Sequence, residues 1–314
     1  MTSAEPAVEE DVETTYRRKR RLGRIIIASF LAVIVIVEVL TFIGRAQTAR
    51  QDAKPHTFYG IEGSRGPDYV TVAAHILEIS PVAGTMQVRV TVEPHGTYSL
   101  PDGALAKSLN IDADGYAGGS ITLAAGEIPP PVQLSLTING DLSQYPIDSY
   151  STLLTVRLSE VAVSPTGKEV KLGTPVPAQL VVNANQHDWA LSVSKVGVWP
   201  DGAISVNIAV HRGIATRAFA FFELFMMVSL AVIAVAITYS AIISSKPLEF
   251  SLFAWLGAML FALPAIRGTM PGIPGVGTLI DYAVFFWCLL AVAGCLITAA
   301  ITYITTTMRE HRHH

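Results

Sequence analysis

Residues 203–243, AISVNIAVHRGIATRAFAFFELFMMVSLAVIAVAITYSAII, contain the change of pattern on which the fold depends. Up to His211, apolar side chains alternate with polar ones, which is typical of a strand with one buried face. From Ala218 to Ile243 the sequence is almost continuously apolar, and it exceeds the ~20 residues that a helix needs to cross a bilayer. The stretch therefore predicts a β-domain that is followed at once by a membrane helix.

Three further apolar runs have about the length of a membrane span. They are Ile25–Gly44, Phe250–Ile266 and Leu279–Ile304. With 51% hydrophobic and only 15% charged residues, the chain is too apolar for an ordinary soluble protein. We expect an α+β membrane protein with four transmembrane helices, at residues 25–44, 217–243, 249–266 and 279–305.

The N-terminal region predicts a signal anchor. Residues 1–16 contain five acidic residues and no basic one, which favours a disordered tail within residues 1–24. The basic cluster Arg17–Arg24 follows, and it either sets the topology or also binds anionic headgroups. A cleavable signal peptide is the alternative for Ile25–Gly44. This run is longer than the roughly 7–15 residues of a signal core, and no small-x-small cleavage site follows it.

Basic residues predict the orientation of the helices, because they favour the cytoplasmic side. With the N-terminus inside, nine Lys and Arg residues flank the cytoplasmic side and four flank the outer side. We therefore expect a plasma-membrane protein with both termini in the cytoplasm, including the tail 306–314. Residues 45–216 would then lie outside the cytoplasm, inserted between the first and second helices.

Several segments of residues 45–216 show the period of two that predicts strands. The alternating apolar positions are Val70, Val72, Ala74 and Ile76; Met86, Val88, Val90 and Val92; Leu134, Leu136 and Ile138; and Leu154, Val156 and Leu158. Two more strands, WALSVSKVGVW and AISVNIAVH, flank the turn sequence Pro200-Asp201-Gly202. Short strands separated by Gly, Pro and Asp indicate an antiparallel β-sandwich, and we expect it to be immunoglobulin-like.

Charge and cysteine content exclude several functions for this domain. Fifteen acidic residues between Asp52 and Asp201, against nine basic residues between Lys54 and Arg212, give a net charge of minus six, which excludes nucleic-acid binding. The only cysteines, Cys288 and Cys295, lie in the last apolar run, so the exported domain has no disulfide. We expect them to be packing residues rather than redox or metal sites.

A stiff segment, LPAIRGTMPGIPGVGTLIDY at 263–282, separates the last two apolar runs. Its prolines and glycines cannot continue a lipid-exposed helix, because unpaired backbone groups are not tolerated against lipid. We expect Pro264 to end or kink the third helix, and residues 267–278 to form an outer loop that couples the bundle to the β-domain. The candidate coupling residues are Pro264, Pro271, Gly272, Pro274, Gly275 and Gly277.

Ionisable residues in the outer parts of the helices predict an intramembrane polar cluster. It would consist of Glu38, Glu223, Arg267 and Asp281, which lie at similar depths in the four-helix topology. A lone carboxylate in hydrocarbon costs ~2.5 kcal/mol or more, so these groups should face one another or water. The cluster is either structural, with Arg267 paired to an acid, or part of a proton or ion pathway, or a site where a partner's helix docks. The inner halves of the helices offer only Ser and Thr, which disfavours a pathway.

The sequence YPIDSY at 145–150 predicts a structural turn before a strand. Pro146 restricts the backbone, Asp148 is expected to accept hydrogen bonds from nearby backbone amides, and Tyr145 and Tyr150 would anchor the turn. A contact with a ligand is the alternative. Similar turns occur in the β-sandwiches of pentameric ligand-gated channels, although the topology here differs.

Motifs of catalysis and cofactor binding are not found. The segment GIPGVGT at 272–278 superficially resembles a phosphate-binding loop, but it has no Lys after the last Gly and no preceding strand. We therefore expect no nucleotide site, no metal, no cofactor and no enzymatic activity.

The segment LGAMLFALPAIRGTMPGIPGVGTLIDYAVFFW at 256–287, together with YPIDSY and the HRG at His211–Gly213, resembles an uncharacterised family of actinobacterial and fungal membrane proteins, the domain of unknown function 4436. The resemblance extends from about residue 25 to 305. It implies one crossing, an extracytoplasmic β-domain and three more crossings, and it implies an actinobacterial plasma membrane. It supplies no known activity and no catalytic residues.

These observations favour a non-enzymatic accessory or scaffold protein of the cell envelope. Its partners would be the lipid bilayer and a membrane-protein or envelope component, with no nucleic acid and no nucleotide. A small transporter or ligand-gated pore that uses the polar cluster is the alternative, and a hydrolase is the least favoured function.

Overall fold

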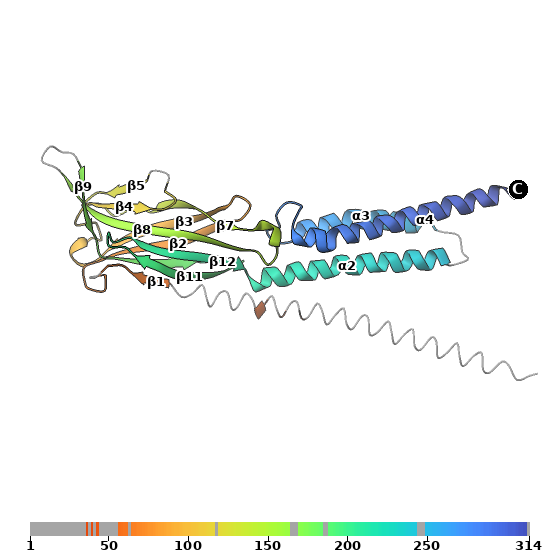
Figure 1. Ribbon diagram of the computed structural model, residues 1–314, viewed down its shortest axis with the longest axis horizontal. Coiled ribbons are helices and arrows are strands. Elements are labelled where there is room, and N and C mark those ends of the chain that lie inside the picture. The colour runs from red at the N-terminus through yellow and green to blue at the C-terminus, as the bar shows by residue number, and fades with distance from the viewer. Residues whose placement is uncertain are drawn as a thin grey trace, which may run out of the picture.

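The computed structural model describes residues 36, 39, 42–43, 56–61, 64–116, 119–163, 169–184, 188–243 and 249–312. Figure 1 shows an elongated molecule in which a β-domain (residues 56–212) and a helical bundle (residues 214–312) lie end to end. The protein is thus an α+β protein whose two parts meet at one narrow junction.

The first sheet has five strands in the order β1-β10-β2-β3-β6. Their bounds are β1 His56–Tyr59, β2 Val70–Ser80, β3 Thr85–Pro94, β6 Val132–Thr137 and β10 Ala178–Ala184. β2 and β3 form an antiparallel hairpin that pairs Ser80 with Thr85, so the turn at residues 81–84 closes this end of the sheet.

The second sheet contains seven strands, with β11-β12-β8-β4-β5 in order and β7 and β9 also paired to β8. Their bounds are β4 Leu109–Ala113, β5 Ser120–Leu123, β7 Asn139–Gly140, β8 Ser149–Val163, β9 Glu169–Pro175, β11 Trp189–Val198 and β12 Ile204–Arg212. β11 and β12 are antiparallel, and the predicted turn Pro200-Asp201-Gly202 joins them. This hairpin prediction is confirmed.

One strand pair departs from the expected antiparallel arrangement. β10 pairs with β2 in parallel, with Ala178 opposite Val70 and Ala184 opposite Ile76. A parallel pair needs a long crossover connection, which the chain between these two strands provides. Period-two alternation carries no information on strand direction, so the sequence did not indicate this pair.

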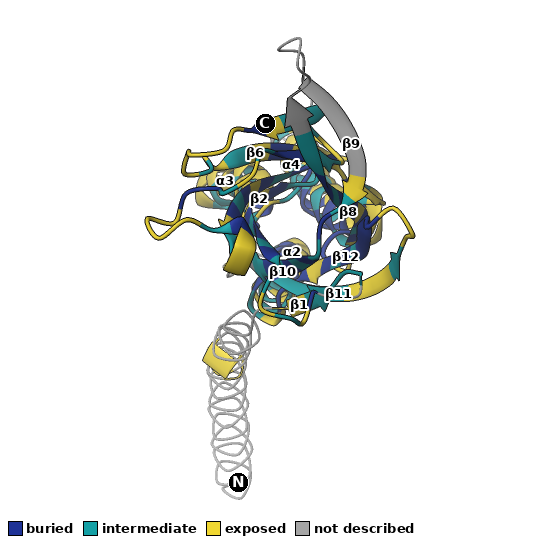
Figure 2. Cartoon of the chain, turned by 90° about the vertical axis from the view of Figure 1, so that its left-hand side faces the viewer, coloured by how far each residue is buried: buried dark blue, intermediate teal, exposed yellow. Residues whose placement is uncertain are grey.

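The two sheets share one hydrophobic core. Figure 2 looks along the molecule from the β-domain end and shows buried residues inside the ring of strands. Every alternating apolar position predicted from the sequence is buried, from Val70 at 0% exposure to Ile138 at 6%. The predicted inward faces of β2, β3, β6 and β8 are therefore confirmed.

Three helices of the bundle are long and apolar enough to cross a membrane, and all three follow the β-domain. They are α2 (Ile214–Ile243), α3 (Phe250–Thr269), and the π-helical segment η3 (Asp281–Phe285) continued by α4 (Phe286–Arg312). Many of their large apolar side chains are exposed, including Phe221, Phe261 and Trp287. Such surfaces are compatible with a surrounding bilayer.

The predicted first helix and residues 1–24 lie outside the described residues, apart from Ile36, Val39, Phe42 and Ile43. These four are helical and exposed. Pro264 was expected to end or kink the third helix; it does not end it, because α3 continues through Pro264 to Thr269, and the kink stays a prediction. Proline removes one helical hydrogen bond, which neighbouring helices can compensate within a membrane. Arg267 consequently lies on the last turn of α3 and not in the loop.

Candidate functional site at the junction of β-domain and bundle

Tyr145 belongs to the β-domain, but its side chain is part of the core of the helical bundle. It is fully buried in the same cluster as Leu224 of α2 and Met270, which follows α3. Its hydroxyl donates a hydrogen bond to the carbonyl of Pro271 at 3.1 Å. Burial raises the pKa of Tyr145 to about 12. The loop between η2 (Leu142–Gln144) and β8 thus inserts an aromatic side chain into the end of the bundle.

Arg212, the last residue of β12, forms a buried ion pair with Asp148. Its Nε lies 3.1 Å from both carboxylate oxygens of Asp148, and the two side chains are 4% and 0% exposed. The Tyr150 hydroxyl donates to the same carboxylate at 2.7 Å. Burial and this hydrogen bond raise the pKa of Tyr150. Among the described residues, Asp148 accepts from side chains and not from the backbone amides that the sequence suggested.

The Arg212 guanidinium also reaches across to the loop of the bundle. Nη1 donates to the carbonyl of Pro271 at 3.3 Å, and Nη2 donates to the carbonyl of Gly272 at 3.0 Å. The rings of Trp189 and Tyr145 flank it, with centroids 4.5 Å and 5.0 Å from Cζ. One side chain therefore joins the β-domain to the bundle through charge, hydrogen bonds and ring contacts.

Gly272 is the loop residue that this contact requires. Its φ of +60° lies in the left-handed region, and a Cβ at this position would stand 2.6 Å from Nη1 of Arg212. Only glycine permits both the conformation and the approach. Of the other predicted coupling glycines, Gly277 also has a positive φ, of +124°, whereas Gly275 has open space around it.

Arg267 and Asp281, two members of the predicted polar cluster, form a second buried ion pair. Nε and Nη2 of Arg267 lie 2.6 Å and 2.8 Å from the two oxygens of Asp281. Nη2 also approaches the carbonyls of Pro274 and Gly275, at 3.4 Å and 3.2 Å. The pair therefore closes the Pro/Gly loop between α3 and η3.

Asp281 also stabilises the start of the last helix. Its Oδ2 accepts from the amides of Gly277 and Thr278, at 2.8 Å and 2.9 Å, and from the Thr278 hydroxyl at 3.0 Å. A carboxylate near a helix N-terminus satisfies amides that have no partner within the helix. These contacts hold the Asp281 carboxylate at the start of the last helix.

Glu223 lies on α2 and has a partner for only one of its oxygens. Oε1 accepts from the Thr269 hydroxyl at 2.7 Å, and this hydroxyl lies equally close to the carbonyl of Ile266. Oε2 is buried without a hydrogen-bond partner in the described part of the chain. Glu38, the fourth member of the predicted cluster, lies outside the described residues. The role of this cluster stays a prediction.

A cleft of about 300 Å³ opens beside Arg212. It lies between the β2–β3 turn, the segment Asp188–Trp189 and the loop Pro271–Ile273. Its lining combines aliphatic side chains with Arg212, Asp188 and Thr216. The junction therefore has a surface recess as well as direct contacts.

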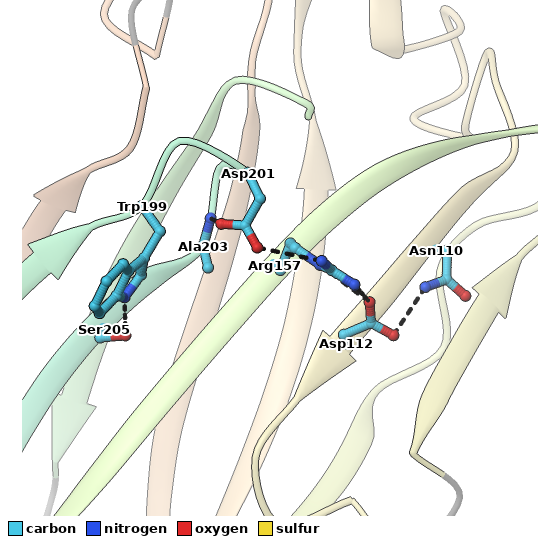
Figure 3. Close-up of polar contacts among 7 residues, drawn as sticks. All are labelled: Asn110, Asp112, Arg157, Trp199, Asp201, Ala203 and Ser205. Carbon is cyan, nitrogen blue, oxygen red and sulfur yellow. Dashed lines mark hydrogen bonds and ion pairs between the residues drawn. The ribbon is translucent and has the colours of Figure 1, made fainter. Parts of the chain in front are cut away.

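A separate polar group lies at the other end of the β-domain (Figure 3). Arg157 of β8 bridges Asp112 of β4, at 2.6 Å, and Asp201 of the β11–β12 turn, at 3.2 Å. Arg157 is 41% exposed, so these ion pairs are weak stabilisers. They hold the hairpin against the neighbouring strands and carry no indication of catalysis.

No group of three or more His, Cys, Asp or Glu residues that could hold a metal ion occurs among the described residues. Cys288 and Cys295 are buried free thiols. Arg212 was not predicted as a site residue, although it entered the charge count and belongs to the HRG at His211–Gly213 that carries the resemblance. The available signal was a lone arginine at the last position of a strand, directly before an apolar helix.

Comparison with known families divides the chain close to this junction. Residues 61–210 match the family described as Domain of unknown function (DUF4436). This match spans most of the β-domain. Residues 212–306 match a second family, described as Domain of unknown function (DUF8686). No curated protein matches the chain.

The predicted resemblance to DUF4436 is therefore confirmed for residues 61–210, and its extent is corrected. The DUF4436 match covers the β-domain, whereas the segment 256–287 that suggested the resemblance lies within the DUF8686 match. The two matches are separated by one residue, His211, and Arg212 is the first residue of the second. The contacts of Arg212 thus join the DUF4436 domain to the DUF8686 helices.

Proposed function

We propose that this protein is a non-enzymatic accessory or scaffold protein of the cell envelope. The observation that carries the proposal is the buried junction, in which Arg212 and Tyr145 fix the β-domain on the bundle. A fixed β-domain presents its surface at a constant height and orientation relative to the membrane. This suits a protein that positions other envelope components.

The proposal includes a topology. The run Ile25–Gly44 is a fourth crossing, both termini are cytoplasmic, and the DUF4436 domain is an immunoglobulin-like sandwich outside the plasma membrane. The excess of basic residues on the predicted inner side supports this orientation. A cysteine that replaces the exposed Trp199, at the far end of the β-domain, should react with a membrane-impermeant maleimide in intact cells. Labelling only after the cells are opened would refute the topology.

The scaffold function is tested by gentle crosslinking in native membranes, followed by purification of the full chain and identification of attached proteins. We expect a defined membrane or envelope protein to copurify with the wild type and with Gly268→Ala. Gly268 has open space around it, which makes it the control. Gly272→Ala disturbs the Arg212 contact and should reduce the recovery of the partner. Purification of the wild type without any companion would count against a scaffold.

A small transporter or ligand-gated pore is the second candidate, because Glu223 keeps one buried oxygen without a hydrogen-bond partner in the described part of the chain. Such a carboxyl group can accept a proton or an ion. Ion flux should be measured in proteoliposomes that contain the wild type or the double variant Glu38→Gln/Glu223→Gln. Flux that survives both substitutions would eliminate this site. The complete pairing of Arg267 with Asp281 supports a structural role for those two residues.

A further inference from the structure

The bundle-facing end of the β-domain lies very close to the candidate membrane spans. β12 ends at Arg212 and α2 begins at Ile214, so a single residue connects the two parts. One residue spans at most ~3.6 Å. Arg212 also binds the loop between α3 and η3 directly. If the helices cross a bilayer, this end of the β-domain cannot stand away from the lipid surface.

Two loops at this end expose aliphatic side chains to the surroundings. Val82, in the β2–β3 turn, is 70% exposed, and Ile147, in the loop before β8, is 54% exposed. The β2–β3 turn lines the same cleft as Pro271 and Ile273 of the bundle. The loop of Ile147 is held by the hydrogen bond from Tyr145 to Pro271. Both side chains therefore lie beside the ends of the helices.

The two loops themselves present no unpaired charge to lipid. The turn Ser80–Gly84 contains no charged residue. Asp148, next to Ile147, is buried and paired with Arg212. Apolar side chains gain free energy when they leave water, and the region of the glycerol and upper acyl chains offers that environment next to the helices.

The far end of the β-domain supplies matched positions. Ile128, before β6, is 70% exposed, as Val82 is, and Trp199, at the β11–β12 turn, is 55% exposed, close to Ile147. β12 runs from the Trp199 end to Arg212 at the bundle. The amide of Leu105 binds the carbonyl of Glu127, which places Ile128 near the connections after β3, at the same far end. The exposed fractions are thus nearly the same at the two ends, whereas the distance from the helices differs.

We propose that Val82 and Ile147 insert into the interfacial region of the lipid bilayer and seat the bundle-facing rim of the DUF4436 domain on the membrane. The partner is the surface of a neutral phospholipid bilayer. Anionic headgroups are disfavoured because residues 52–212 carry a net charge of minus six. The rim that carries Val82 and Ile147 would contact the membrane in addition to the α2, α3 and α4 spans. This proposal does not depend on the scaffold function.

The test is spin-label accessibility in the full chain. Cys288 and Cys295 are replaced by alanine, single cysteines replace Val82, Ile147, Ile128 and Trp199 in turn, and each is labelled with a nitroxide. The proteins are reconstituted at one molecule per nanodisc of phosphatidylcholine. Collision rates are measured with oxygen, which concentrates in lipid, and with a water-soluble nickel complex. Because all four side chains are at least half exposed, the labels should not disturb the core.

We expect the ratio of oxygen to nickel collisions to exceed one at positions 82 and 147 and to fall below one at positions 128 and 199. In detergent-free nanodiscs with one chain each, a second copy of the chain cannot supply the apolar contact. Equal, water-like ratios at all four positions would overturn the proposal. Ratios of oxygen to nickel collisions above one that appear only at several molecules per nanodisc would also overturn it, because the rim would then contact another chain and not lipid.

Discussion

The Asp148→Ala substitution gives the sharpest test of the junction. It removes the counter-ion of Arg212, whose side chain is 4% exposed, and it removes the acceptor of the Tyr150 hydroxyl. Both remaining groups stay buried, and each loses the carboxylate that it binds. The substitution therefore affects the connection of the two parts as well as the β-domain.

The expected loss follows from the contacts that disappear. Removal of one partner of a buried ion pair costs about 3–5 kcal/mol, because the other charge remains uncompensated. The unpaired Tyr150 hydroxyl has a cost of about 1–3 kcal/mol by itself, but the two effects overlap at a single carboxylate. We expect a total loss of about 3–5 kcal/mol in the free energy of unfolding, which corresponds to a fall of about 6–20 °C in the Tm of a domain of this size.

The assay is urea unfolding of the full chain in detergent, measured by pulse proteolysis of the β-domain. Asp112→Ala is the control, because it removes the 2.6 Å partner of Arg157, whose side chain is 41% exposed. An exposed ion pair of this kind contributes about 0–1 kcal/mol to the free energy of unfolding. Asp148→Asn keeps an acceptor for Tyr150 and removes only the charge, so its loss should lie between those of the other two variants. If Asp148→Ala destabilises the domain no more than Asp112→Ala, the buried junction does not have the energetic role assigned to it.

Three further predictions concern the loop, the second ion pair and pH. Gly272→Ala should lower the free energy of unfolding by roughly 1–2 kcal/mol or more and expose the junction to protease, because residue 272 has a φ of +60°. Gly268→Ala should leave the cleavage pattern unchanged. Asp281→Asn should lower the free energy of unfolding of the bundle by about 3–5 kcal/mol, because it leaves the buried Arg267 charge uncompensated. The double variant Arg267→Met/Asp281→Asn removes that charge and keeps an acceptor for Gly277 and Thr278, so it should recover part of the loss in thermal unfolding, and absence of any recovery would contradict a purely structural pair. Burial raises the pKa of Tyr145 to about 12, so the folded state favours the protonated phenol. The contribution of this phenol to the free energy of unfolding is complete below pH ~10 and is lost as the pH rises toward 12. Urea titrations at pH 9 and 11 should show a smaller pH effect for Tyr145→Phe than for the wild type, and identical pH effects would refute this assignment.

Local patterns in the sequence predicted the strands β2, β3, β6, β8, β11 and β12 and the helices of the bundle. The alternation at Val70, Val72, Ala74 and Ile76 indicated a buried strand face, and these residues are buried. This succeeds because the side chains of a strand point alternately to its two faces. Long apolar runs likewise predicted α2, α3 and the last helix, because a span needs only length and the absence of charge. The end of the third helix was predicted at Ile266, whereas α3 continues to Thr269, and tertiary contacts can compensate for the proline inside it.

The pairing of distant residues was decided only by the tertiary structure. Arg212 meets Asp148 and Gly272, which are 64 and 60 residues away along the chain. No periodicity links such positions, because their proximity depends on how two sheets and a loop pack around one guanidinium. The parallel pairing of β2 and β10 is also a property of the assembled sheet. The sequence by itself determined which segments are strands and which are membrane-length helices, since burial of apolar side chains acts locally. How the β-domain is fastened to the bundle was decided by the folded structure, because a buried charge is stable only where all of its partners are brought together.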